Sequence, residues 1–288
     1  MESEFNQLTM KTDAGFSTLP TESYQLLLGL NKNSFQILVF DPENNKFIAF
    51  AQKQFTPLGG ANLYHEKLKN FISENTLLHN TYNNAFLIWE TQQATLVPSA
   101  LYETSEQSAY LRFNQNINEG DKILCDKMKN TGTFNIFSYP DILSNLSLPG
   151  KLQVHHHASS LIESMLITSK SDIAQKIVYV NVHPSFFDIV VVEYNKLTFY
   201  NTFSYKTAED FAYFVLFVFN QMKLNPEQQG IYFSGDILRD SQLYDISFKY
   251  IRNIDFVKPP VQISNSYILQ DIEPHRLYYL YSRILCEL

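Results

Sequence analysis

Two segments of this chain repeat the same order of apolar runs and polar turns. Residues 24–50 read YQLLLGLNKNSFQILVFDPENNKFIAF, and residues 177–200 read IVYVNVHPSFFDIVVVEYNKLTFY. A shift of 152 residues places Leu28 on Val180 and Phe35 on Phe187, and a shift of 150 then places Lys46 on Lys196 and Phe55 on Tyr205. Identities between the two segments are few, so the repeat rests on pattern and length. It restricts the chain to a fold built from two related halves.

Each copy continues with a helix and then a buried strand. Gly59 and Gly60 precede an amphipathic pattern over residues 61–78, and Thr207 forms a helix N-cap signal before an apolar helix that runs to Leu224. Strands follow at residues 85–90 and 230–234. The second helix is apolar nearly all round, which predicts that it lies between two layers. The pattern predicts an α/β protein with duplicated βββαβα halves and mixed sheets. The predicted boundaries are a flexible segment 1–20, a first half 21–173 and a second half 174–288.

The remaining segments are less regular. Residues 122–128 and 133–139 alternate as strands around a turn at residues 130–132, which predicts a hairpin. Helices are expected at residues 159–169 and from Asp271 to the C-terminus, with Pro274 in the first turn of the latter.

Composition and charge exclude several classes of protein. The 288 residues are 45% hydrophobic and carry a net charge of −7, with no concentration of Lys and Arg. A disordered chain and a nucleic-acid-binding surface are therefore not expected. The most apolar window, residues 211–219, is too short for a membrane span, and the N-terminus lacks a secretion signal. Cys125 and Cys286 form no metal-binding pattern, so a cytoplasmic protein with reduced thiols is expected.

The duplicated βββαβα pattern, from residue 24 to the C-terminus, resembles the actin-like ATPase superfamily, whose halves have a ribonuclease H-like fold. That superfamily includes sugar kinases, the Hsp70 nucleotide-binding domain, actin, and divergent proteins of bacterial pilus assembly. The greatest similarity is expected to an uncharacterised bacterial family with this fold. The resemblance implies that ATP lies between the halves and that the first turn of each half, with a pattern like D-x-G-[ST], holds the phosphates.

Both of these turns depart from the family pattern. In the first, Asn31 stands near the Asp position and Asn33 at the glycine position, followed by Ser34. In the second, Asn181 replaces Asp, and His183 and Pro184 replace glycine, followed by Ser185. Asn lacks the charge that holds hydrated Mg²⁺, and only glycine lets backbone N–H groups approach a phosphate closely. Nucleotide affinity is therefore expected to be weak or lost, because each charge-assisted bond contributes about 1.5–3 kcal/mol.

A few further residues correspond to cleft positions of the superfamily. Asp188 matches the later Asp of the second motif, and Ser234, Gly235 and Asp236 stand where a Gly-Gly adenosine contact is common. Glu90 ends a buried strand where some sugar kinases carry a catalytic carboxylate, although a strand-end Glu is more often simply solvated. Asp188 and Asp236 are candidates to hold a metal-bound water, yet Asp is common beside turns.

Two other sequence features have a functional and a structural interpretation. The run His155-His156-His157 is either a metal site, in which a strand would present His155 and His157 on one face, or a polar patch at an element boundary. We expect the patch and no metal. The tyrosine-rich run at residues 277–281 indicates either core packing against the apolar helix or a protein interface.

The sequence favours a catalytically silent actin-like module, a pseudoenzyme that acts through contacts with an unidentified protein. No catalytic residue, metal or cofactor is assigned. Two alternatives stay open: an ATP-dependent phosphotransferase or ATPase with an atypical interlobe cleft, which would use ATP and Mg²⁺, and a small-molecule sensor that uses the cleft.

Overall fold

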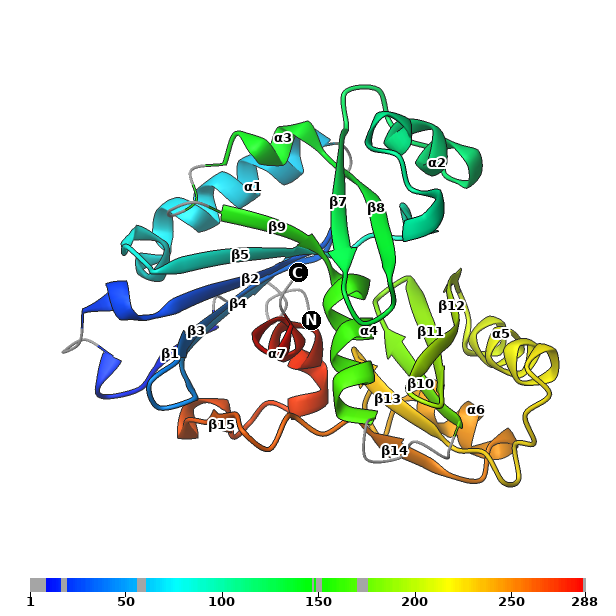
Figure 1. Ribbon diagram of the computed structural model, residues 1–288. Coiled ribbons are helices and arrows are strands. Elements are labelled where there is room, and N and C mark those ends of the chain that lie inside the picture. The colour runs from blue at the N-terminus through cyan, green and yellow to red at the C-terminus, as the bar shows by residue number, and fades with distance from the viewer. Residues whose placement is uncertain are drawn as a thin grey trace. The chain divides into compact units, whose positions relative to one another are not determined.

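The computed structural model describes residues 9–16, 20–55, 61–146, 148, 152–169 and 176–286 (Figure 1). The chain divides into two compact units. Unit 1 comprises residues 1–128, 132–159 and 261–271, and unit 2 comprises residues 129–131, 160–260 and 272–288. These units group residues by contact, whereas the halves 21–173 and 174–288 were drawn from the repeat. The two divisions differ mainly in two segments: residues 160–169 belong to the second unit, and residues 261–271 belong to the first.

The main sheet of unit 1 has the strand order β1-β4-β3-β2-β5-β9, with β15 also paired to β4. The strands are β1 (Thr9–Thr12), β2 (Gln25–Leu30), β3 (Ser34–Asp41), β4 (Lys46–Gln54), β5 (Asn84–Trp89), β9 (Leu152–His156) and β15 (Ser264–Asn265). The meander β2-β3-β4 is antiparallel, and β5 and β9 join it in parallel. β1 lies within the N-terminal segment predicted to be flexible.

Helices α1 (Ala61–Glu74) and α3 (Asp141–Ser144) lie on the same side of this sheet (Figure 1). Leu68 and Phe71 of α1 and Leu143 of α3 belong to one apolar core with the side chains of the strands. Phe71 meets Phe35 edge to face, with ring centroids 5.2 Å apart. The predicted helical pattern is therefore confirmed, although Gly59 and Gly60 lie outside the described residues.

A second, three-stranded sheet in unit 1 has the order β6-β8-β7. Its strands are β6 (Ala94–Pro98), β7 (Lys122–Met128) and β8 (Thr133–Tyr139), and helix α2 (Gln107–Asn114) packs on it. The β7–β8 hairpin has the predicted bounds. The sequence did not reveal that β6 completes a separate sheet, because its apolar residues are few and only Val97 is buried.

The sheet of unit 2 has the order β12-β11-β10-β13-β14. Its strands are β10 (Lys176–Val182), β11 (Phe186–Glu193), β12 (Lys196–Ser204), β13 (Ile231–Gly235) and β14 (Ile254–Phe256). This order and the strand directions repeat β4-β3-β2-β5-β9 of unit 1. The duplicated meanders predicted from the sequence are therefore confirmed. Their register agrees as well, since Leu28 pairs with Ile37 while Val180 pairs with Ile189, each residue shifted by 152.

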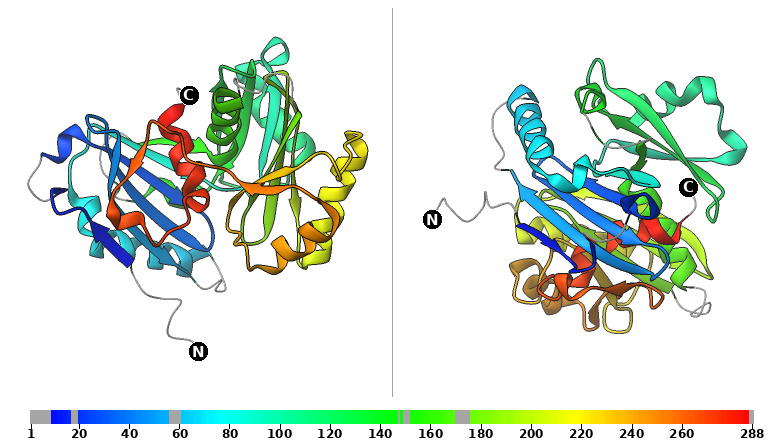
Figure 2. Two further views of the ribbon diagram at one scale, coloured as in Figure 1. Left: turned by 90° about the horizontal axis from the view of Figure 1, so that it is seen from below. Right: turned by 90° about the vertical axis from the view of Figure 1, so that its left-hand side faces the viewer.

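Helices α5 (Ala208–Gln221) and α6 (Gln242–Tyr250) lie side by side on one face of this sheet (Figures 1 and 2). Helices α4 (His157–Thr168) and α7 (Tyr278–Leu285) complete the chain. Thr207 caps α5 in a reciprocal capping box with Asp210, as the sequence predicted. The C-terminal helix starts later than expected, because Pro274 begins a 3₁₀ turn that precedes α7.

The prediction that α5 lies between two layers is wrong. Phe211, Val215 and Phe219 face the sheet and are buried, whereas Tyr213 is 63% exposed and Phe217 is 43% exposed. A helix that packs on one sheet buries only one stripe, so apolar residues on the other side stay at the surface. No helix among the described residues is long and apolar enough to cross a membrane.

Candidate functional site

The turn between β2 and β3 is held by the side chain of Asn31. The Asn31 Oδ1 atom accepts hydrogen bonds from the backbone N–H groups of Asn33 at 2.7 Å and of Ser34 at 2.8 Å. These are the N–H groups that the resemblance assigns to phosphate binding. In the structure they are already occupied by an oxygen of the chain itself.

Two further residues fix Asn31 in this position. Its Nδ2 atom donates to Oε1 of Glu90 at 3.2 Å, and its carbonyl accepts a hydrogen bond of 2.5 Å from the Tyr64 hydroxyl of α1. Glu90 is 7% exposed, so the solvated strand-end carboxylate considered from the sequence is in fact buried beside an amide. Burial, followed by the charge of Glu90, raises the pKa of Tyr64 far above its ordinary value.

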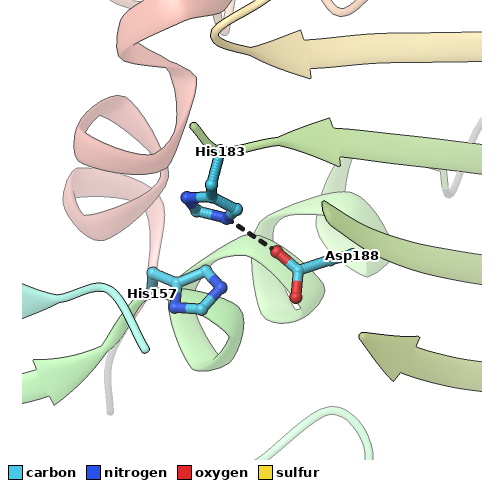
Figure 3. Close-up of side chains that lie close together, drawn as sticks. All are labelled: His157, His183 and Asp188. Carbon is cyan, nitrogen blue, oxygen red and sulfur yellow. Dashed lines mark hydrogen bonds and ion pairs between the residues drawn. The ribbon is translucent and has the colours of Figure 1, made fainter. Parts of the chain in front are cut away.

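The corresponding turn of unit 2, between β10 and β11, surrounds a buried carboxylate. Asp188 is fully buried. Its Oδ2 atom lies 2.9 Å from His183 Nε2 and accepts a hydrogen bond from Asn181 Nδ2 at 3.2 Å. Its Oδ1 atom accepts a hydrogen bond from the Tyr200 hydroxyl at 3.2 Å. Figure 3 shows the bond between His183 and Asp188, drawn with His157, the first residue of α4. Burial, and then the charge of Asp188, raises the pKa of Tyr200 well above its ordinary value.

Neighbouring side chains complete this buried network. Ser234 Oγ donates to Asn181 Oδ1 at 2.9 Å, and the His183 ring stacks on Phe186 with centroids 4.1 Å apart. The Tyr205 hydroxyl donates to the His183 carbonyl at 2.7 Å, as Tyr64 does to Asn31 in unit 1. Burial raises the pKa of Tyr205 to about 12, and Asp236 contributes to the shift. These hydrogen bonds offset part of the cost of removing the Asp188 carboxylate from water.

The remaining sequence candidates lie near this turn. Ser185 is exposed, and its carbonyl accepts from the Tyr205 N–H. Gly235 has a φ of +81°, and a Cβ there would lie 2.1 Å from the Val182 carbonyl oxygen. The close pairing of β13 with β10 therefore requires glycine at this position. Asp236 is exposed and accepts from Arg276 Nη2 at 2.7 Å, which is a surface ion pair.

The triple histidine is divided between a strand and a helix. β9 ends at His156 and α4 begins at His157, so the strand alternation that would place His155 and His157 on one face does not apply. His155 Nδ1 lies 2.8 Å from Asp126 Oδ1, and His156 Nδ1 lies 3.1 Å from Asn135 Nδ2. The run therefore lies at an element boundary, and its three side chains are buried.

Sequence reasoning missed the contacts of Tyr64 and Tyr200, and it missed that the Asn31 side chain caps the first turn. A signal for Asn31 existed, because Asn side chains often accept from the backbone two residues on and so form an Asx turn. Tyr205 was aligned with Phe55, but nothing in that alignment revealed its bond to the turn. These contacts depend on pairing between strands and on packing of α1, which spacing along the chain does not encode.

The sequence profile of DUF3822, described as a protein of unknown function, matches residues 13–254. This chain belongs to the DUF3822 family. The DUF3822 chain is similar to a Bacteroides thetaiotaomicron protein with an actin-like ATPase fold and unknown function, at 20% identity and a TM-score of 0.75, over 93% of this chain and 97% of that one. The actin-like fold expected from the resemblance is therefore confirmed.

A second similar structure is that of a PilM–PilN type IV pilus biogenesis complex. The identity is 10% and the TM-score 0.57, over 93% of this DUF3822 chain and 100% of that chain. An ethanolamine utilization protein, EutJ, from Carboxydothermus hydrogenoformans matches at 9% identity and a TM-score of 0.46, over 90% and 88% of the two chains. No curated protein sequence matches the chain.

Proposed function

We propose that this DUF3822 protein is a catalytically silent actin-like module that acts through contacts with another protein. The observation that supports this most strongly is the Asn31 cap, because it fills the first turn with a side-chain oxygen where the superfamily places phosphate. To bind ATP in the usual way, the turn would first have to break two short hydrogen bonds and move an amide that is also held by Glu90.

The second turn supports the same proposal independently. Pro184 has no N–H to donate, and the His183 N–H is already bonded to the Phe186 carbonyl at 2.9 Å. The carboxylate that would organise Mg²⁺ and water, Asp188, is enclosed by His183, Asn181 and Tyr200. Each turn thus satisfies its own polar groups, and a polar group that is satisfied internally has little to gain from a ligand.

The similarity to a chain of the PilM–PilN complex supports a protein-binding role, because that protein is seen in a complex with another protein. At 10% identity the similarity carries the fold and not the partner, so the partner of this chain is left open.

The proposal is tested by titrating the full chain with Mg²⁺ and ATP in a calorimeter, and by reconstituting the chain with a purified partner captured from its source. We expect no nucleotide binding in the micromolar range. We also expect a stoichiometric protein complex whose affinity is the same with Mg²⁺–ATP as with EDTA. An ATP dissociation constant in the low micromolar range, or sustained ATP hydrolysis, would instead favour a working phosphotransferase or ATPase.

A double variant and a control test whether the chain descends from a nucleotide-binding protein. Asn33→Gly combined with His183→Gly reintroduces glycine at both turns, and we expect a measurable gain of nucleotide affinity if the chain descends from a nucleotide binder. Asn45→Gly serves as the control, since it is also a change to glycine and Asn45 has a φ of 49°, which glycine adopts readily, in the turn between β3 and β4.

A further inference from the structure

The outer face of α5 carries an apolar patch that is continuous with the edge of the second sheet. Tyr213 and Phe217, one turn apart on the helix, are 63% and 43% exposed, and their rings lie 6.4 Å apart. Tyr213 also meets Phe214 at 5.3 Å, and Phe214 stacks on Phe203 of β12 at 5.0 Å. Four aromatic rings therefore form one connected cluster from the sheet to the surface. We call this cluster, with α5, the α5 face.

The charges of the α5 face are arranged with opposite signs at its two ends. Glu209 lies one turn before Tyr213, and Lys223 lies two residues beyond the end of the helix. Both are exposed. Asp210, the other acidic residue at the N-terminal end, is engaged with the backbone N–H groups of Lys206 and Thr207. No ion pair of Glu209 or Lys223 occurs within the described part of the chain. Along its length, the α5 face thus presents an acidic residue, two aromatic residues and then a basic residue.

A surface with this order is complementary to itself after a twofold rotation. When two copies of α5 lie antiparallel, Tyr213 of each copy meets Phe217 of the other, and each Glu209 approaches the opposite Lys223. A twofold interface uses the same patch on both partners, so each favourable contact occurs twice. The antiparallel arrangement also opposes the helix dipoles favourably.

We infer that the α5 face is a self-association surface, and that its occupant is a second copy of this chain. This inference does not depend on the proposed function as a catalytically silent, protein-binding module. The helix has 14 residues and is therefore about 21 Å long, so a strip about 10 Å wide along it covers much less than the roughly 800 Å² per partner of a standard interface. The dimer is accordingly weak and forms at high protein concentration.

Sedimentation velocity of the full chain over a concentration series, from micromolar to near-millimolar, tests the inference. We expect reversible dimerisation of the wild type, and loss of dimer in Tyr213→Ser combined with Phe217→Ser. Phe113→Ser is the matched control, because Phe113 is 92% exposed on α2 of the other unit, and it leaves dimerisation unchanged. Circular dichroism and thermal melting show whether each variant is folded.

A charge exchange makes the test specific for the antiparallel arrangement. Glu209→Lys alone and Lys223→Glu alone each replace two attractions with two repulsions, which we expect to weaken the dimer about tenfold. The double variant Glu209→Lys with Lys223→Glu restores the attraction and the wild-type dissociation constant. Lys249→Glu on α6 is the charge-matched control. A monomer at every concentration, a dimer insensitive to the α5 variants, or a double variant as weak as the single ones would each overturn the inference.

Discussion

Replacing Asn31 by aspartate restores the acid that the actin-like superfamily carries, yet the structure predicts that this change destabilises the fold. Asp can still accept from the N–H groups of Asn33 and Ser34. It cannot donate to Glu90, and it places a carboxylate oxygen where the Asn31 Nδ2 atom now lies, 3.2 Å from Glu90 Oε1. The variant thus exchanges a hydrogen bond to a buried carboxylate for a contact between two carboxylates.

The magnitude follows from these two losses. A hydrogen bond to a charged group contributes about 1.5–3 kcal/mol, and the repulsion of two carboxylates adds to that loss. We expect Asn31→Asp to lower the free energy of unfolding by about 3 kcal/mol at neutral pH. In a unit of this size, each kcal/mol changes the melting temperature by about 2–4 °C, so a decrease of at least about 6 °C is expected.

The effect also depends on pH. In the variant, two adjacent carboxyl groups cannot both ionise readily, so one titrates in the folded state with a pKa above its ordinary value of about 4. A raised pKa makes the folded variant more stable at low pH and progressively less stable as pH rises through that value. At low pH the protonated carboxyl can also donate a hydrogen bond to the other carboxyl group and so replace the lost one. The loss should therefore be small at pH 4 and close to its full size at pH 7.

Urea unfolding of both proteins at pH 4 and pH 7 measures this directly. Asn33→Asp is the matched control, because it is the same chemical change two residues further along, and we expect it to alter stability by less than about 0.5 kcal/mol. An Asn31→Asp protein as stable as the wild type at both pH values would refute the reasoning, since the amide would then have no structural role in the turn.

Three further predictions concern other parts of the two units. Gly235→Ala should destabilise the protein by about 3 kcal/mol or abolish folding, because its Cβ would lie 2.1 Å from the Val182 carbonyl oxygen. Gly120→Ala, at a φ of +91° in open space, should lower the free energy of unfolding by only about 1 kcal/mol. Equal melting temperatures for the two variants would contradict this prediction. Tyr205→Phe removes the 2.7 Å bond to the His183 carbonyl and should lower the free energy of unfolding by about 1 kcal/mol in urea, whereas Tyr194→Phe, exposed on a turn, should have no effect. Hydrogen bonds from Ser266 and Lys46 lower the pKa of Asp13 to about 2. The charge of Asp13 therefore contributes about 1 kcal/mol to the free energy of unfolding above pH 4, and this contribution is lost as the pH falls from 4 to 2. The difference in stability between wild type and Asp13→Asn should shrink over that range, and a constant difference would show that the charge plays no part.

The meanders were predictable because their information is local. An apolar run of fixed length, repeated after 152 residues, determined which residues pair, and β2 with β3 and β10 with β11 pair in that register. β1 and β15 were not predictable, because Thr9–Thr12 is polar and mostly exposed, and Ser264–Asn265 becomes a strand only by pairing with Lys46 and Phe47 of β4. Such short edge strands are defined by tertiary pairing and not by their own sequence.

The residues of the two turns could be named from the sequence, whereas their hydrogen bonds could not. The sequence names the residues of the two turns as departures from the phosphate-binding pattern that the resemblance implies. Their new partners were not visible, because the contacts of Glu90 and Tyr64 with Asn31, and of Tyr200 with Asp188, join residues that are 12 to 59 positions apart. The sequence shows that Asn stands near the Asp position of the superfamily pattern, whereas the structure shows which N–H groups its side chain binds.

Amide hydrogen exchange of Asn33 and Ser34 in the full chain, with and without Mg²⁺–ATP, tests the central claim most directly. If the Asn31 carboxamide occupies the turn, both amides exchange slowly in the free protein and their rates do not change when nucleotide is added. Fast exchange in the free protein that becomes slow with Mg²⁺–ATP would show that the turn is open and still binds phosphate, and the account would be wrong.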